Sequence, residues 1–168
     1  DANVRGEATP APYLLIVTAR GQVMRFSFSS FRAPSTRNGR RYCRLNSGDH
    51  VAYADLVSSG KTLFIVSREA RLIHFRVCDI PVLAGPGKGV RGLKLEDRDE
   101  VLGAMQLTRP SDALRIRNIN DKVLSFGQTK YTLTSRGGRG VKTSQRTGFA
   151  EIVRPEIDLV DWSEYESE

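Results

Sequence analysis

Apolar and polar residues alternate in a way that predicts β-hairpins along most of the chain. Residues 14–17 (LLIV) and 63–66 (LFIV) are short apolar runs rich in β-branched residues. A few turn residues and then an alternating segment follow each run, as in residues 22–26 (QVMRF). An apolar strand, a short turn and an alternating strand are together typical of a hairpin.

Further alternating segments predict two more strands after each of the first two hairpins. Residues 42–45 and 93–95 predict a third strand, and residues 50–54 and 100–104 predict a fourth. Each of these units would then contain four strands.

The hairpin turns differ in the residue that must bend the backbone. Gly21 suits a left-handed conformation in the first turn, and Asp121 tolerates it in the third. Ala70 suits it poorly, so we expect the second turn to differ from the other two. Asp49 and Asp99 are expected to accept hydrogen bonds from turn N–H groups.

The pattern recurs with a period near 50 residues. Residues 66–75 repeat residues 17–26 at an offset of 49, and residues 123–126 repeat residues 72–75 at an offset of 51. Similar offsets superpose a further set of glycine, aspartate and apolar positions: Gly39 on Gly89, Leu45 on Leu95, Asp49 on Asp99, Val51 on Val101 and Gly140 on Gly89. Such a period means one supersecondary unit per repeat, and four strands make a propeller blade.

The predicted fold class is therefore all-β, a propeller-like array of about three four-stranded blades. The proposed division of the chain is a linker at 1–12, repeats at about 13–57, 62–108 and 113–150, and an acidic C-terminal tail at 151–168. Closed propellers typically use four to eight blades, so either the array is open or blades are missing. Residues 143–150 lose the repeat register and predict a divergent end cap.

Residues 87–92 (GKGVRG) satisfy the G-x-G-x-x-G spacing of a dinucleotide-binding loop. That motif needs a strand before the first glycine and a helix at the last. Here Pro81 and Pro86 precede the loop, and residues 93–99 alternate like a strand. We therefore predict no cofactor, and an NAD- or ATP-dependent enzyme ranks last among the functions considered.

A basic, glycine-containing loop instead recurs between the second and third strands of every unit, at residues 37–41, 87–91 and 136–142. Its glycines let the backbone approach another surface, and its Arg and Lys side chains reach phosphate oxygens. A plain connecting loop is the alternative. The basic side chains that we expect to contact DNA, in and around these loops, are Arg20, Arg25, Arg37, Arg40, Arg41, Lys88, Arg91, Lys94, Lys130, Arg136, Arg139, Lys142 and Arg146.

Charge is divided unevenly along the chain. The formal net charge is +7, but residues 151–168 hold seven acidic residues against Arg154 alone. Residues 1–150 then hold 25 basic and 12 acidic residues, a net charge of +13. An excess of this size favours a nucleic-acid partner over a merely solvated basic surface.

Few of the remaining residues suggest a metal site or a disulfide. Cys43 and Cys78 stand 35 positions apart, and with His50 and His74 they show no metal-ligand spacing. We interpret both thiols as reduced core residues, with a disulfide as the alternative. No apolar run approaches the ~20 residues of a membrane-spanning helix, and residues 1–7 do not resemble a signal peptide. A cytoplasmic protein that does not contact a membrane is expected.

The repeats resemble those of a known family. A Thr-x-x-Gly hairpin, a following Phe, a Gly-Lys-Gly-Val-x-Gly loop and an Asp before an apolar strand are similar to the C-terminal DNA-wrapping domain of bacterial type IIA topoisomerase A subunits. The resemblance covers residues 13 to about 150 and is strongest in the first two repeats. It implies a β-pinwheel, whose blades exchange strands and whose basic rim bends DNA.

The resemblance also implies partners, a location and an absence of catalysis. The partners would be duplex DNA, the remainder of the A subunit, and the ATPase B subunit, in a nucleoid-associated bacterial protein. DNA cleavage would belong to a tyrosine of a separate domain, and the five tyrosines here lie outside any matching motif. A propeller that binds an acidic protein partner remains the alternative function.

Two members of this family differ in a glycine-rich box. In gyrase the box Gln-Arg-Arg-Gly-Gly-Lys-Gly is tied to chiral wrapping. Residues 134–140 (TSRGGRG) keep its last five positions with Arg for Lys, but have Thr134 and Ser135 at the first two. The stretch also lies in the last repeat instead of the first. These departures favour topoisomerase IV over gyrase.

Overall fold

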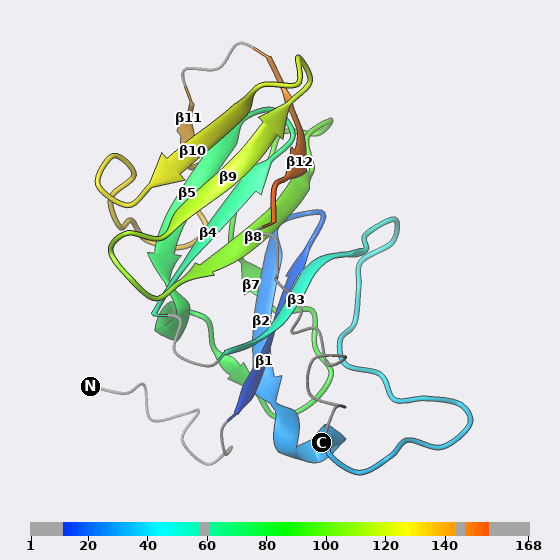
Figure 1. Cartoon of the computed structure of the whole chain (residues 1–168). Helices are drawn as coiled ribbons and strands as arrows, with labels where there is room; N and C mark the ends of the chain where they lie inside the picture. Colours follow the sequence, from blue (N-terminus) through cyan, green and yellow to red (C-terminus); the bar gives the residue numbers. More distant parts are fainter. Residues whose placement is uncertain (1–11, 58–60, 144–146, 155–168) are drawn as a thin grey trace, which may run out of the picture.

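The computed structural model describes residues 12–57, 61–143 and 147–154, and Figure 1 shows them as three successive antiparallel units. None of these described residues lies in an α-helix, and none of the sheets closes on itself. The predicted all-β fold class is confirmed, in the form of an open array. No helix in the described ranges is long and apolar enough to span a membrane.

Each unit is built on the predicted hairpin. In the first unit, β1 (Tyr13–Thr18) pairs with β2 (Gln22–Ser27), and β3 (Val51–Val57) pairs with the other edge of β1. A short 3-10 helix, η1 (Phe28–Phe31), follows β2. Within this unit the strand order is β3-β1-β2, and the far edge of β2 is left for strands of the next unit.

The second and third units repeat this order. The second contains β4 (Thr62–Ser67), β5 (Arg71–Arg76), the 3-10 helix η2 (Val77–Asp79) and β8 (Val101–Leu107). The third contains β9 (Ala113–Asn118), β10 (Val123–Gly127) and β12 (Phe149–Ile152). Strand β12 ends two residues beyond position 150, where we placed the end of the third repeat.

The fourth strand of a blade comes from the next unit. Strands β6 (Val82–Leu83) and β7 (Val90–Arg91) of the second unit pair with β2 of the first, and β11 (Val141–Lys142) of the third pairs with β5 of the second. This exchange is the one implied by the β-pinwheel resemblance. Among the described residues the third sheet contains β10, β9 and β12, one strand fewer than the four predicted for each blade.

The core lies between successive sheets. Leu63 and Ile65 of β4 face the first unit and pack with its apolar residues, whereas Phe64 and Val66 face the third unit. The run LFIV is apolar throughout because β4 is buried on both faces. Full burial of each such side chain stabilises the fold by roughly 1.5–3 kcal/mol.

The segments predicted as third strands do not form strands. Residues 42–45 and 93–95 have no strand pairing, although Leu93 is fully buried. The backbone N–H of Leu93 donates to the Gly21 carbonyl instead, at 3.1 Å. In residues 93–95 the alternation therefore reflects the burial of Leu93 and Leu95 against the neighbouring unit, without a ladder of hydrogen bonds, whereas Tyr42 and Leu45 of the first segment are exposed.

The second hairpin turn matches the other two, so our expectation about Ala70 is wrong. The φ angles of Gly21, Ala70 and Asp121 are 81°, 62° and 63°. Each N–H donates to the carbonyl three residues earlier. The Ala70 methyl is buried in the core shared with the third unit, which offsets the roughly 1–2 kcal/mol of left-handed strain.

The predicted roles of the two turn aspartates are confirmed. Asp49 Oδ1 accepts from the N–H groups of Arg20 and His50, both at 2.9 Å. Asp99 Oδ1 accepts from the N–H groups of Glu69 and Glu100, at 3.0 and 2.9 Å. Each carboxylate thus ties a hairpin turn to the strand that closes the same unit.

The two cysteines are free, as expected, but only one is partly buried. Cys43 is half-buried, whereas Cys78 is exposed in the middle of η2 and is not a core residue. Our interpretation of Cys78 as a core residue is therefore wrong. The apolar positions Val77 and Ile80 on either side of it are the ones that pack inward.

Candidate nucleic-acid interface

The second and third basic loops, residues 87–91 and 136–142, lie on the outer edge of the preceding hairpin. In the second loop, Val90 and Arg91 pair with Val23 and Gln22 of β2. In the third, Val141 and Lys142 pair in the same register with Leu72 and Arg71 of β5. The loops are therefore the segments by which neighbouring units join.

Glycine is required in these loops for close packing. Gly89 and Gly140 have φ angles of 71° and 65°. A Cβ atom at Gly89 would overlap the Val23 carbonyl oxygen, and one at Gly140 would lie 2.6 Å from the Leu72 carbonyl oxygen. The expected close approach of the loop backbone to another surface is therefore seen in the second and third loops, but not at Gly39 of the first.

The dinucleotide motif has no structural support. Residues 93–100 contain a turn and irregular backbone but no helix, so no helix N-terminus meets the loop at Gly92. Gly92 instead packs against Val23, where a Cβ would lie 2.5 Å from Cγ1. The glycine spacing serves the junction between the first two units.

The three basic loops are linked in series by backbone hydrogen bonds. The N–H of Arg44, which follows the first loop (residues 37–41), donates to the Gly87 carbonyl at 2.9 Å. Gly137 N–H donates to the Gly92 carbonyl, and Lys94 N–H to the Gly138 carbonyl, both at 2.8 Å. The loops therefore follow one another along a single side of the array.

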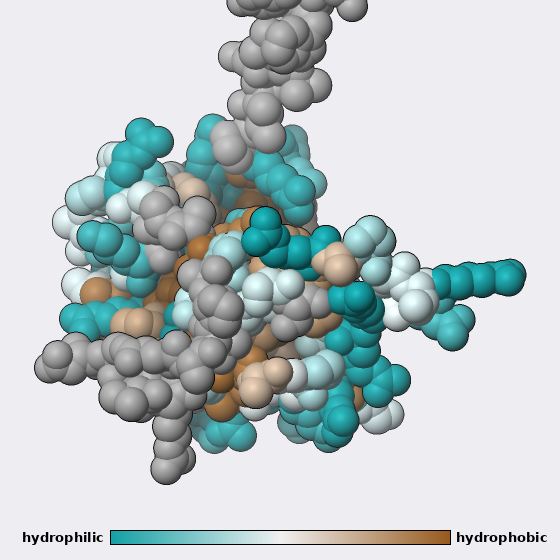
Figure 2. Space-filling model, turned by 90° about the horizontal axis from the view of Figure 1, so that it is seen from below, coloured by the Kyte–Doolittle hydropathy of each residue, from teal (hydrophilic) through white to brown (hydrophobic). Residues whose placement is uncertain are grey.

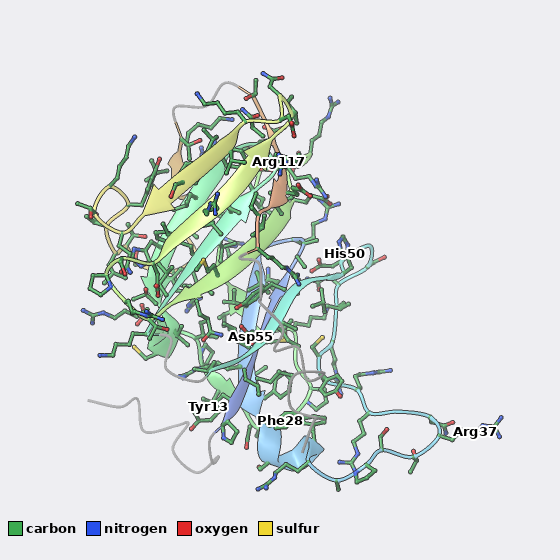
Figure 3. All side chains as sticks on the ribbon, in the orientation of Figure 1. Tyr13, Phe28, Arg37, His50, Asp55 and Arg117 are labelled. Carbon is green, nitrogen blue, oxygen red and sulfur yellow. The ribbon has the colours of Figure 1, made fainter. Side chains whose placement is uncertain are left out.

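Most of the predicted DNA-binding side chains on this side are exposed to solvent. They are Arg20, Arg37, Arg40, Arg41, Lys88, Arg91, Lys94, Lys130, Arg139 and Lys142. Figure 3 shows Arg37 at the tip of the first loop, pointing away from the molecule. In Figure 2 the same loop stands out to the right as a hydrophilic arm. Arg146 lies outside the described residues.

Two predicted arginines are instead held by backbone carbonyls. Arg25 Nε donates to the Ile80 carbonyl at 2.6 Å, and the guanidinium lies 5.4 Å from the centre of the Tyr13 ring. Burial lowers the pKa of Arg25 below its usual value. Arg136 donates to the carbonyls of Asp79 and Arg91, at 3.1 and 2.7 Å. Both side chains therefore fasten neighbouring units to the segment around η2.

One acidic side chain lies within the basic surface. Glu96 Oε1 is 3.6 Å from Arg71 Nη2 and 3.9 Å from Arg139 Nη1. It offsets part of the repulsion between Arg71 and Lys142, which face each other across β5 and β11. A phosphate that binds Arg139 must therefore compete with this half-exposed carboxylate.

Arg44 is a basic residue that sequence reasoning missed. Its side chain is exposed, and its N–H makes the same contact with the second loop that Lys94 makes with the third. Lys94 was predicted and Arg44 was not, although the two positions coincide at the repeat offset of 50. Applying that offset to every predicted residue would have found it.

A second feature is a cleft of about 700 Å³ between β3, β8 and β12. Tyr53 lies in it and donates from its hydroxyl to Asp55 Oδ2 at 2.9 Å. Burial raises the pKa of Tyr53 to about 12, so its hydroxyl stays protonated at neutral pH. The described residues hold no cluster of three or more potential metal ligands there or elsewhere.

Comparison with known proteins identifies relatives of the fold and of the sequence. A family model described as "DNA gyrase C-terminal domain, beta-propeller" matches residues 12–58 and 61–108. The A subunit of DNA gyrase from Helicobacter pylori is 31% identical over 139 residues, which cover 80% of this chain and 17% of that protein. The chain thus spans less than a fifth of the length of this relative.

Two solved structures share the fold. The C-terminal domain of DNA topoisomerase IV superposes with a TM-score of 0.75 at 19% identity, covering 86% of this chain and 46% of that one. The DNA gyrase A C-terminal domain superposes with a TM-score of 0.70 at 22% identity, covering 86% and 49%. At these identities the likeness concerns the fold alone.

Proposed function

Because the chain belongs to the family of DNA gyrase C-terminal domains with a β-propeller fold, we propose that it binds and bends duplex DNA. It would do so as a non-catalytic part of the A subunit of a type IIA topoisomerase, presenting DNA to the breakage-reunion core. Its partners would then be duplex DNA, the rest of that subunit, and the ATPase B subunit.

The observation that carries this proposal is the serial linkage of the three basic loops. Three backbone hydrogen bonds hold the loops in order, so we define a basic strip by their exposed side chains, which are Arg37, Arg40, Arg41, Lys88, Arg91, Arg139 and Lys142. Duplex DNA carries one negative charge per ~1.7 Å of its axis, so such a strip suits a run of phosphates.

The strip suits phosphates better than base edges. Its second and third loops lie against the neighbouring hairpins, and no described α-helix is available to enter a major groove. The affinity for DNA should therefore depend steeply on salt and little on base sequence.

We also expect that the chain does not bind NAD or ATP, and calorimetry can check this. Saturable binding of either nucleotide would contradict the interpretation of residues 87–92.

The salt dependence of DNA affinity tests the proposal. Fluorescence anisotropy with two unrelated duplexes should give equal affinities that fall steeply with salt, with a log–log slope of about −0.9 per phosphate contacted. Lys88→Ala together with Arg91→Ala should make that slope about 1.8 units shallower. Arg115→Ala removes an exposed arginine from β9, away from the loops, and serves as the control. A flat salt response, or one preferred sequence, would contradict the proposal.

Within the family we propose the topoisomerase IV type of behaviour, in which DNA is bent without strong chiral wrapping. The support is the altered box at residues 134–140, of which Thr134 and Arg136 are occupied by contacts with the second unit. Binding to relaxed circular DNA, followed by nicking-closing, should leave the linking number nearly unchanged. A large shift of one sign would favour gyrase-type wrapping.

A protein-binding propeller is the second candidate, because the cleft between β3, β8 and β12 is large enough to hold a peptide side chain or two. The two functions differ in how binding depends on duplex length. A DNA-bending strip prefers longer duplexes until the strip is filled, whereas a protein-binding surface gives only weak contact with DNA at any length.

A further inference from the structure

The junction between neighbouring units occurs twice within the chain, and the described residues contain both halves of a third junction left open. In each complete junction, a glycine of the basic loop lies over the second hairpin strand of the preceding unit. Gly89 lies over Val23 of β2, and Gly140 over Leu72 of β5. These two cases define what a donor loop and an acceptor strand look like in this protein.

Strand β10 is an acceptor without a donor. It pairs with β9 on one edge, and the described residues offer no partner on its other edge. At the repeat offsets, Val123 corresponds to Val23 and Leu72, which are 0% and 1% exposed because they pack in the cores between successive units beside the donor loops. Val123 itself is 38% exposed. Among the described residues it is therefore an apolar position at an uncovered strand edge.

The first basic loop has the backbone of a donor, but none of the described strands pairs with it. Gly39 already has a φ angle of 71°, equal to that of Gly89, yet no atom lies within 4 Å of the position of a Cβ there. Leu45, the counterpart of Leu95, is 38% exposed, whereas Leu95 packs against the core of the first two units. The loop thus has the backbone conformation of a donor before anything is bound.

The two open halves cannot meet within one molecule in this conformation. In Figure 1, β10 lies at the upper left and the first loop at the lower right, so the three units separate them. Each half is complementary to the other and not to itself. A contact between two copies would therefore be head-to-tail.

We propose that two copies of this chain associate end to end, with residues 39–41 of one copy adding to β10 of the other. The register of the two internal junctions places Arg40 opposite Val123 and Arg41 opposite Lys122. This contact would bring the basic strips of the two copies into line, extending the surface available to DNA. Self-association does not depend on the proposed function, and it can be tested without DNA.

Added salt should strengthen this association, whereas it should weaken DNA binding, because the two copies repel each other through their positive charges. Arg41 and Lys122 would face each other, as Lys142 and Arg71 do in the internal junction, where Glu96 lies close by. The third repeat has Thr147 in place of Glu96, so this repulsion is not offset. The net charge of +7 on each chain adds to it, and added salt should strengthen the association.

Sedimentation equilibrium of the full chain without DNA tests the proposal. The mean mass should rise with protein concentration, and should rise more at high salt than at low salt. Gly39→Asn should weaken association at least about tenfold, because its Cβ would meet the backbone of β10. Asn tolerates a left-handed backbone, so the free loop is not strained. Gly48→Asn is the matched control, since Gly48 has the same φ of 71° and the same open surroundings.

A second variant tests the acceptor. Val123→Lys should also prevent association, because it places a further positive charge opposite Arg40, whereas Ile119→Lys, at a 64% exposed position of the same unit, should not. Mixing Gly39→Asn with Val123→Lys leaves one intact donor and one intact acceptor, so the mixture should form a dimer and nothing larger. A wild-type chain that stays monomeric at high salt, equal effects of Gly39→Asn and Gly48→Asn, or a mixture that stays monomeric would each overturn the proposal.

Discussion

Single residues at the junctions decide whether neighbouring units can pack. Gly89 and Gly39 share a φ of 71°, but only Gly89 lies against another backbone. We expect Gly39→Ala to cost about 1 kcal/mol of unfolding free energy, from left-handed strain alone. Gly89→Ala should cost at least about 2 kcal/mol, because the methyl group also displaces β2. Denaturant unfolding measures both, and equal losses would mean that the close approach at Gly89 is unimportant.

Arg136 and Arg139 lie in one loop but should behave differently when replaced. Arg139→Ala with Lys142→Ala removes two exposed cations, so the salt slope of DNA binding should become about 1.8 units shallower with stability unchanged. Arg136→Ala removes donors from two carbonyls and should lower the unfolding free energy by about 1–3 kcal/mol. Thermal unfolding and anisotropy separate the two effects. Loss of stability from the Arg139 and Lys142 changes would contradict this division.

His74 should make stability depend on pH. It is buried, with Nδ1 2.7 Å from the Tyr131 carbonyl oxygen and its ring edge-on to Phe64. Burial lowers its pKa, so the unfolded chain takes up a proton at a higher pH than the folded one. The unfolding free energy should therefore fall as pH drops below about 6.5. His74→Asn should reduce that fall, whereas exposed His50→Asn should leave it unchanged, and identical pH profiles for the two variants would contradict this role.

At the scale of strands, the hydrophobic pattern predicted the hairpins and the closing strands, whereas the exchange of strands followed only from the family resemblance. The run LFIV in β4 indicates a strand because both of its faces are buried. Strand β7 pairs over two residues only, and its position depends on contact with β2 of another unit. Residues 93–95 alternate like a strand, but their N–H groups bond to turns of two other units. The local pattern of apolar and polar residues indicates which side chains are buried, but it does not indicate which strand the backbone pairs with.

For the basic loops, too, the sequence indicated exposure and charge but not the contacts between units. Their glycine spacing and charge were visible in the sequence, and most of the chosen side chains are exposed. Arg25 and Arg136 have the same composition cues but bond to carbonyls around η2, which only the packing of units reveals. Ala70 likewise adopts the left-handed turn because burial of its methyl group in the core offsets the strain.

Strand β12 (Phe149–Ile152) continues the third unit beyond residue 150. Ile152 pairs with Ile116, and Val153 N–H donates to the Arg115 carbonyl at 2.9 Å. A chain ending at residue 154 keeps both contacts and serves as the reference. A chain ending at residue 150 should melt lower, because it loses that pairing and the contact of Ile152 with Gly103. Equal melting of the two chains would show that β12 contributes little.

At the scale of the whole molecule, residues 1–150 are basic, whereas the last residues are acidic. Residues 155–168 carry six acidic residues and no basic one. If they compete with DNA for the basic strip, a chain ending at residue 154 should bind duplex DNA more tightly at low salt, and the gain should shrink as salt rises. A solubilising segment is the alternative, and unchanged affinity at low salt would favour it.

The central claim is that the linked basic loops bend duplex DNA. The most direct test is energy transfer between dyes on the two ends of a duplex well shorter than the ~150 base-pair persistence length, which stays straight when free. Binding of the full chain should raise the transfer. Lys88→Ala with Arg91→Ala should reduce that rise at saturating protein, whereas Arg115→Ala should not. Saturated binding with unchanged transfer would contradict the account.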